Sequence, residues 1–220
     1  DSDIKVVAGA GDNAAAAIGT GTVGNGKCNI SLGTSGTIFI SSNEFGVDPN
    51  NALHSFAHAD GNYHLMGCML SAASCNKWWM ENILQTKDFA VEQEDLEGWL
   101  GKNDVFFLPY LMGERSPIND TDATGMFIGL RPDTTRSQML LAVLEGVSFA
   151  IRDNIEVAKA IGIDVKTSYI CGGGAKSKLW QQIVSDCLDL ELNVTVSSDS
   201  SLGSAMLAGV AMGVFKDASD

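Results

Sequence analysis

Short runs of apolar residues rich in strand-forming types, bounded by glycine-containing turns, recur over the first third of the chain, which is the pattern of strands. It predicts strands at residues 27–32, 37–41, 53–59 and 63–68. Gly33-Thr34-Ser35-Gly36 joins the first two strands as a tight hairpin, and Asp60-Gly61-Asn62 turns between the last two. The opening third is therefore expected to form an antiparallel sheet.

Later parts of the chain show the periodicity of helices. The longest predicted helix covers 136–161, where Leu140, Val143, Leu144 and Val147 recur at three- and four-residue steps. Residues 112–132 are predicted to be a loop. The remaining predicted helices are 13–18, 70–84, 92–100, 178–188 and 202–214, and the remaining strands are 105–111, 167–171 and 190–196. This order indicates an α/β protein, a mixed sheet flanked by helices in a single domain over residues 1–220.

Composition and charge narrow the class of protein. The chain has 220 residues, 45% of them hydrophobic, which is enough for a proper core. Its formal net charge of -13 argues against nucleic acid or an anionic membrane as a partner, because both require basic patches. The apolar run at 205–215 is too short and too rich in glycine to span a bilayer.

The cysteines indicate a reducing compartment. There are five of them, Cys28, Cys68, Cys75, Cys171 and Cys187, and no Cys-x-x-Cys pair, which argues against both a disulfide framework and a zinc site. No metal ligands are predicted. With no secretory pattern at the start, a cytoplasmic location is expected. The opening Asp1-Ser2-Asp3 has no Met and resembles the middle of a longer protein.

Three glycine-bracketed turns carry the candidate chemistry: Gly9-Ala10-Gly11-Asp12-Asn13, Ser31-Leu32-Gly33-Thr34-Ser35-Gly36-Thr37 and Gly172-Gly173-Gly174-Ala175-Lys176-Ser177. Glycine lets a backbone approach a ligand closely, and successive bare N–H groups bind anions. A phosphate ligand with Asp12 beside it points to phosphoryl transfer, in which Asp12 takes a proton from the attacking hydroxyl.

Each of these turns also has a purely structural interpretation. Asp12 or Asn13 is a good helix cap. Gly33-Thr34-Ser35 suits an ordinary hairpin turn. The glycine triplet suits a helix start that needs tight packing, and it is neither a G-x-G-x-x-G motif nor a P-loop. Arg115 would pair either a phosphate or a carboxylate such as Glu114.

In their order, these segments resemble the FGGY carbohydrate kinases. The similar segments are Gly11-Asp12-Asn13-Ala14-Ala15, Ser31-Leu32-Gly33-Thr34-Ser35-Gly36, Met69-Leu70-Ser71-Ala72-Ala73, the run from Leu108 to Pro117 through Gly113-Glu114-Arg115, and Gly172-Gly173-Gly174-Ala175-Lys176-Ser177-Lys178-Leu179-Trp180. The resemblance covers nearly the whole chain. It implies an actin-like, ribonuclease-H-like ATPase lobe, the C-terminal one of two, without the N-terminal lobe that carries most sugar contacts.

The resemblance also implies roles for individual residues. Asp12 would be the catalytic base, Gly33 and Thr34 would face the phosphates of ATP, and Gly173, Gly174 and Ser177 would hold the adenosine. Gly113 would border the nucleotide cleft. The reaction, with ATP and Mg²⁺, would be phosphorylation of D-xylulose to D-xylulose 5-phosphate, a sugar favoured by the run from Leu108 to Pro117.

Two alternatives stay open at this point. One is a kinase for another sugar or polyol, such as gluconate, ribulose or glycerol. The other is a non-catalytic, actin-like nucleotide-binding module. The isolated lobe is expected to be inactive, and the face that would meet the other lobe makes a homodimer conceivable.

Overall fold

A computed structural model of the chain describes residues 3–195 and 200–220. Within these residues, a six-stranded sheet has the order β3-β4-β2-β1-β7-β8. Its first three pairs are antiparallel and its last two, β1–β7 and β7–β8, are parallel. The strands are β1 (Lys27–Leu32), β2 (Gly36–Ser42), β3 (His54–Ala57), β4 (Tyr63–Met69), β7 (Thr167–Cys171) and β8 (Leu192–Val194).

The predicted hairpin between β1 and β2 is confirmed. Leu32 pairs with Gly36, so Gly33, Thr34 and Ser35 form the turn. Successive residues of a strand point to opposite faces. One face of the hairpin is therefore apolar, and the other mixes polar side chains with Phe39. The apolar face carries Cys28, Ile30, Leu32, Ile38 and Ile40, and the other carries Asn29, Ser31, Thr37 and Phe39.

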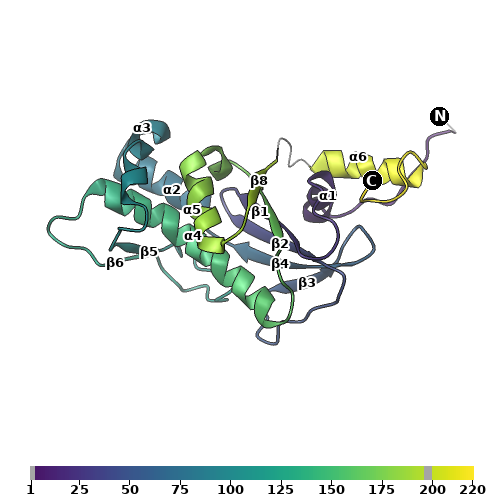
Figure 1. Cartoon of the computed structure of the whole chain (residues 1–220), viewed down its shortest axis with the longest axis horizontal. Coiled ribbons are helices and arrows are strands. Elements are labelled where there is room, and N and C mark those ends of the chain that lie inside the picture. Colours follow the sequence, from purple (N-terminus) through teal and green to yellow (C-terminus); the bar gives the residue numbers. More distant parts are fainter. Residues whose placement is uncertain (1–2, 196–199) are drawn as a thin grey trace.

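Two helices pack on the apolar face of the sheet (Figure 1), and together they build the core. They are α4 (Arg136–Ala160) and α5 (Lys178–Leu188). α4 begins with a capping box in which the side chains of Thr135 and Gln138 bond each other's backbone N–H. Trp180 of α5 is fully buried, and its indole N–H donates to the carbonyl of Leu144 at 3.0 Å. This bond ties the start of α5 to the middle of α4.

α1 (Asp12–Gly19) and α6 (Ser200–Ala211) lie side by side at the opposite end of the molecule from β5 and β6 (Figure 1). The helices approach closely because Gly203 of α6 rests against the carbonyl of Ala15 in α1. A Cβ atom at position 203 would overlap that carbonyl. Gly203 is therefore required by packing rather than by backbone conformation.

The predicted helix over 70–84 is wrong in its start and its form. The N–H groups of Ala72 and Ala73 donate to the carbonyls of Thr34 and Gly33, so the chain turns there before a helix begins. α2 covers Ala73–Trp78 and continues as a π-helix, η1, over Trp79–Ile83. The predicted helix over 92–100 is two elements, α3 (Phe89–Gln93) and a 3-10 turn, η2 (Leu96–Trp99).

The region after η2 also differs from the prediction. The strand predicted over 105–111 is limited to β5 (Phe106–Leu108), because Pro109 follows and cannot donate to a ladder. Its partner β6 (Met126–Ile128) lies inside the predicted loop. The helices predicted over 13–18, 136–161 and 178–188 are confirmed within two residues. The strand predicted over 190–196 is β8, and its last position lies outside the described residues.

Candidate functional site

A cleft of about 770 Å³ lies between the β1–β2 turn, helices α2 and α3, and the glycine-rich turn that leads into α5. Five of the predicted nucleotide-binding residues line it together: Gly33, Thr34, Gly173, Gly174 and Ser177. They come from two segments about 140 positions apart in the sequence. The parallel pairing of β1 with β7 brings them together, because both turns follow the carboxyl ends of neighbouring strands.

The β1–β2 turn is fixed by the start of α2. The carbonyl of Gly33 accepts from the N–H of Ala73 at 2.8 Å, and the carbonyl of Thr34 accepts from the N–H of Ala72 at 3.0 Å. The turn is therefore held from its carbonyl side. Thr34 is exposed, so its hydroxyl remains available to a ligand in the cleft.

The second turn contains three glycines, and they differ in what a Cβ atom would contact at each position. Gly172 has φ +92°, and a Cβ there would lie 2.6 Å from the carbonyl oxygen of Leu32. A Cβ on Gly174 would lie 2.8 Å from the Trp180 ring. A Cβ on Gly173 would meet no atom within 4 Å. Packing explains Gly172 and Gly174, whereas Gly173 lines the cleft with open space above it.

Ser177 has two hydrogen bonds of its own. Its Oγ accepts from the N–H of Trp180 at 3.2 Å, which caps α5, and donates to Oε1 of Gln93 at 2.6 Å. The capping function and the predicted contact with a nucleotide are compatible, since a hydroxyl oxygen has a second lone pair.

Asp12 lies in a separate, smaller hollow of about 250 Å³ on the other face of β1. Its neighbours there are polar side chains from β1 and β2: Asn29, Ser31 and Thr37. The two hollows are linked through β1, because Ser31 lines the hollow of Asp12 and Leu32, the next residue, lines the cleft.

The capping interpretation of Asp12 and Asn13 is wrong. The N-cap of α1 is Gly11, which has no side chain to cap with. Asp12 is exposed at the first position of the helix, and its Oδ1 accepts from the N–H of Asn13 at 2.8 Å. The second carboxylate oxygen of Asp12 is therefore not used to cap the helix.

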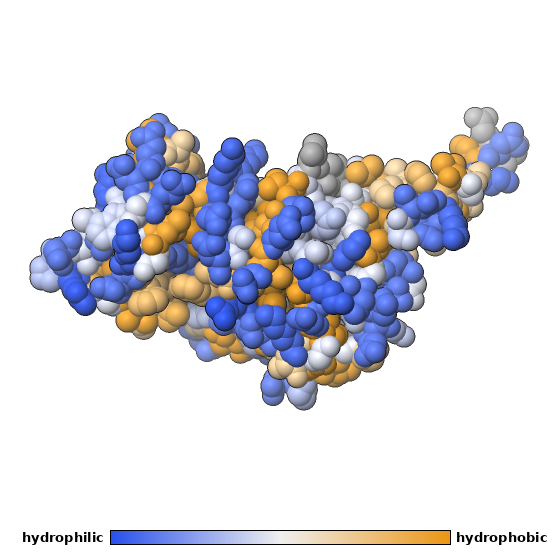
Figure 2. All heavy atoms as spheres, viewed as in Figure 1, coloured by the Kyte–Doolittle hydropathy of each residue, from blue (hydrophilic) through white to orange (hydrophobic). Residues whose placement is uncertain are grey.

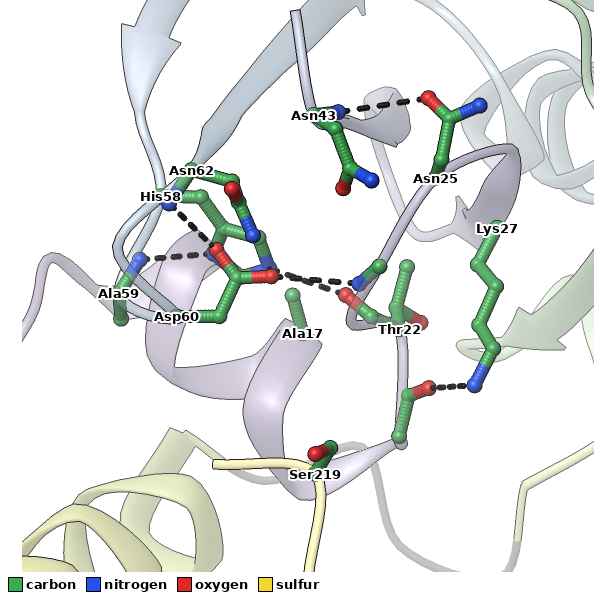
Figure 3. Close-up of polar contacts among 12 residues, drawn as sticks. Ala17, Thr22, Asn25, Lys27, Asn43, His58, Ala59, Asp60, Asn62 and Ser219 are labelled. Carbon is green, nitrogen blue, oxygen red and sulfur yellow. Dashed lines mark hydrogen bonds and ion pairs between the residues drawn. The ribbon is translucent and has the colours of Figure 1, made fainter. Parts of the chain in front are cut away.

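The segment that follows α1 is anchored to the β3–β4 turn (Figure 3). Nδ1 of His58 accepts from the N–H of Ala59 at 2.8 Å, so Nε2 carries the proton and donates to the carbonyl of Thr22 at 3.0 Å. Oδ2 of Asp60 accepts from the N–H of Gly24 at 3.2 Å. These bonds hold the far end of the helix that carries Asp12.

The structure does not bring Gly113 to the cleft. Gly113 has φ +73°, and a Cβ there would lie 2.6 Å from the carbonyl oxygen of Thr121, so packing accounts for this glycine. The neighbouring Glu114 is buried and accepts 2.8 Å bonds from the N–H groups of Leu70 and Arg115. Its burial raises the pKa of the Glu114 carboxyl, against the lowering effect of these two bonds. The predicted role of Gly113 at the nucleotide remains a prediction.

Comparison with known proteins now defines the family. Residues 28–212 match the C-terminal domain of the FGGY family of carbohydrate kinases. The chain belongs to the FGGY carbohydrate kinases. The match includes both segments that line the cleft, and the fold is the actin-like ATPase fold of these sugar kinases.

The relatives and structural neighbours include proteins named as xylulose kinases and one named as a gluconate kinase. The xylulose kinase of Escherichia coli (strain K12) is 41% identical over 216 residues, covering 94% of this chain and 44% of the relative. The xyloylose kinase from Brucella ovis has a TM-score of 0.84 at 37% identity, covering 94% and 43%. Gluconate kinase from Lactobacillus acidophilus has a TM-score of 0.91 at 27% identity, covering 100% and 45%. The chain spans less than half the length of the relatives it matches.

Sequence reasoning did not assign to the cleft the residues contributed by α2, η1 and α3. These are Ala73, Ser74, Asn76, Lys77, Glu81, Phe89, Ala90 and Gln93. Apart from Ala73, which belongs to one of the segments similar to the family, none of them lies in a motif, and the prediction of one regular helix over 70–84 hid which of them line the cleft. Of the chain's described residues, no helix combines the length and apolar character needed to cross a membrane.

Proposed function

We propose that this chain is the nucleotide-binding half of an ATP-dependent sugar kinase, with Asp12 as the catalytic base. The observation that carries the proposal is the cleft itself. Gly33 and Thr34 from one turn and Gly173, Gly174 and Ser177 from another line one cleft, and Gly173 is the glycine that packing leaves unexplained. A ligand that passes close over Gly173 supplies the missing reason.

In the proposed reaction, Gly33 and Thr34 hold the phosphates of ATP, and the turn of Gly173, Gly174 and Ser177 holds the nucleoside. Asp12 accepts the proton of a sugar hydroxyl. The hydroxyl oxygen bonds to the γ-phosphorus while the bond from that phosphorus to the bridging oxygen of the β-phosphate breaks, and ADP leaves with the electron pair. Positioning supplies much of the rate enhancement in such transfers.

Mg²⁺ is proposed to arrive with the nucleotide phosphates. The described residues offer no ligand set for it: they contain no group of three or more His, Cys, Asp and Glu side chains placed to hold a metal ion. Among the described residues that line the cleft, Glu81 is the carboxylate, and it pairs with Lys77 at 4.0 Å. We therefore assign no step to a metal ligand of this chain.

We propose that the rest of the active site belongs to an N-terminal lobe. This is supported by length, because the relatives are more than twice as long as the chain. α6 is also apolar around its circumference, yet Gly203 is its only buried residue in the part that the structure describes. Figure 2 shows hydrophobic residues along this helix, a surface that suits an interface with that lobe or with a second copy.

D-Xylulose is the proposed sugar, and the cytoplasm the proposed location. The curated relatives that support this sugar are named xylulose kinases, with 32–41% identity for those from Escherichia coli and Staphylococcus epidermidis. The similarity to a solved gluconate kinase shows that the same fold also occurs in a protein named for a sugar acid. A panel of D-xylulose, D-gluconate, ribulose and glycerol, tested on the two-lobed enzyme, decides between them.

The test of the proposed base is Asp12→Ala in the two-lobed enzyme. We expect turnover to be lost while Mg·ADP still binds, because the cleft lies on the other face of β1. Asp122→Ala, an exposed acid outside both hollows, is the matched control. Turnover within about tenfold of the parent, about 1.4 kcal/mol of barrier, would mean that Asp12 is not the base. Nucleotide binding without turnover in the parent would favour the non-catalytic module.

A further inference from the structure

Asn76 is a buried polar residue whose amide has an unused acceptor. It lies in α2 and lines the cleft, with only 6% of its surface exposed. Its Oδ1 accepts no hydrogen bond from any residue that the structure describes. An unpaired acceptor in such a place is costly, so a partner that comes from outside the chain is the simplest reason for keeping it.

The surroundings of Asn76 fit a flat aromatic ring. Leu32 and Trp180, both fully buried, line the cleft with it, as does Gly174. Ala73, Phe89 and Ala90 add apolar surface. A nucleobase would bury its apolar ring faces against these side chains and keep its polar edge for the amide.

The charged side chains that line the cleft are Lys77, Glu81 and Lys176, whereas Asn76 is neutral. Lys77 and Glu81 pair with each other at 4.0 Å, and the Lys77 side chain is 67% exposed. Gln93 is engaged by Ser177. Oδ1 of Asn76 is buried in the structure, so a contact with a ligand requires the amide to rotate toward the cleft, and the amide torsion of an Asn side chain is soft.

We propose that Asn76 reads the base of the bound nucleotide, with Oδ1 accepting a hydrogen bond from the exocyclic amine of adenine. This inference rests on the proposed function, because it assumes that the cleft holds a nucleotide. The inference goes beyond the proposed function by naming a specificity residue outside the glycine turns. The amide offers an acceptor to the 6-amino group and a donor to a ring nitrogen beside it.

The experiment compares two ligands that differ only in that amine. Mg·ADP and the Mg²⁺ complex of purine riboside 5′-diphosphate, which lacks the 6-amino group, are titrated calorimetrically into the chain and into Asn76→Leu. Leu has a similar volume and no polar atoms. Lys77→Leu, a neighbour on the same helix that also lines the cleft, is the control.

We expect the parent chain to bind ADP at least tenfold more tightly than the analogue. Asn76→Leu is expected to bind both within about twofold of each other, at the analogue's level, while its melting temperature is unchanged or higher because an unpaired polar group has been removed. Lys77→Leu is expected to keep the tenfold preference.

Two results would overturn the inference while leaving the nucleotide cleft intact. One is Asn76→Leu binding ADP as the parent does. The other is that Asn76→Leu binds both ligands more weakly by the same factor and keeps the preference for ADP. This would mean that Asn76 contacts a part of the nucleotide other than the amine. If the folded parent binds neither ligand, the proposed nucleotide cleft of this chain is wrong, and the inference falls with it.

Discussion

Ser177 at the start of α5 donates a 2.6 Å hydrogen bond to Gln93 of α3, a residue 84 positions earlier in the chain. The same hydroxyl oxygen accepts from the N–H of Trp180, so one side chain caps a helix and bridges two walls of the cleft. Its structural and ligand-binding roles must therefore be separated by the choice of substitution.

We predict that Ser177→Ala and Ser177→Asp separate these roles. Ser177→Ala removes the cap and lowers the free energy of unfolding by about 1 kcal/mol. Ser177→Asp keeps a capping oxygen and adds a negative charge beside a helix N-terminus, so its stability stays near that of the parent. The added charge faces a cleft proposed to hold phosphates and should weaken Mg·ADP binding at least tenfold. Denaturant unfolding and calorimetric titration measure the two effects.

A Ser177→Asp variant that binds Mg·ADP like the parent would contradict this prediction. It would mean that the side chain at position 177 does not contact the bound nucleotide. Ser177→Asn, which caps without charge, serves as the control for shape and should bind more tightly than the Asp variant.

Gly173 and Gly174 form a second matched pair. We predict that Gly174→Ala lowers stability by about 1–3 kcal/mol, because the new methyl group would press on Trp180 and Leu32 in a packed core. Gly173→Ala has open space and should leave stability within about 0.5 kcal/mol of the parent. Thermal unfolding of the two variants checks this contrast.

Position 173 also tests whether the nucleotide binds over this turn. Gly173→Val should bind Mg·ADP weakly or not at all although it folds, because its side chain occupies the space over the turn. If this folded variant binds Mg·ADP as the parent does, Gly173 does not line the nucleotide site.

Local sequence pattern was sufficient for the hairpin and for α4. The β-rich runs at 27–32 and 37–41 predicted β1 and β2 with the turn at Gly33, Thr34 and Ser35. The three- and four-residue repeat gave α4 to within one residue of its end. Both elements are long or strongly patterned, so the pattern and the burial agree.

Elements decided by distant contacts were not predictable. Residues 70–72 resemble the start of a helix, yet the N–H of Leu70 donates to Glu114 and the N–H of Ala72 donates to the carbonyl of Thr34 in the β1–β2 turn. The helix therefore begins only at Ala73. β6 is short and mostly exposed, so it has no alternating pattern to find. The cleft residue Asn76 has no motif at all; its significance appears only when its burial and its unused Oδ1 are seen together.

The contact of Gly203 with the Ala15 carbonyl gives a prediction about α6. Gly203→Ala should lower the free energy of unfolding by about 1–3 kcal/mol, since the added methyl group would force α6 away from α1. This loss exceeds the helix-propensity gain of about 1 kcal/mol that Ala normally brings. Ser204→Ala, an exposed neighbour on the same helix, is the control and should be neutral or slightly stabilising. An equally stable Gly203→Ala variant would mean that the two helices are not in this contact.

His64 makes stability depend on pH. The residue is 5% exposed, and its ring stacks on Phe39 with ring centres 4.0 Å apart and on Phe56 with ring centres 5.4 Å apart. Burial, with a smaller contribution from the charge of His58, lowers the pKa of His64 from 6.5 to about 4, against the raising effect of Asp60. The folded protein therefore resists taking up a proton that the unfolded chain accepts.

Because the pKa of His64 is lower in the folded protein than in the unfolded chain, stability decreases as the pH falls. Above pH 6.5 both states hold His64 neutral, and its contribution to stability is fully present. As the pH falls from 6.5 toward 4, the unfolded chain binds the proton first, and stability drops by up to about 1.4 kcal/mol per pH unit. His64→Phe, which keeps the stack between Phe39 and Phe56, should remove this part of the slope. Urea unfolding at pH 7.5, 6, 5 and 4.5 measures it, and equal slopes for parent and variant would show that other groups govern the acid sensitivity.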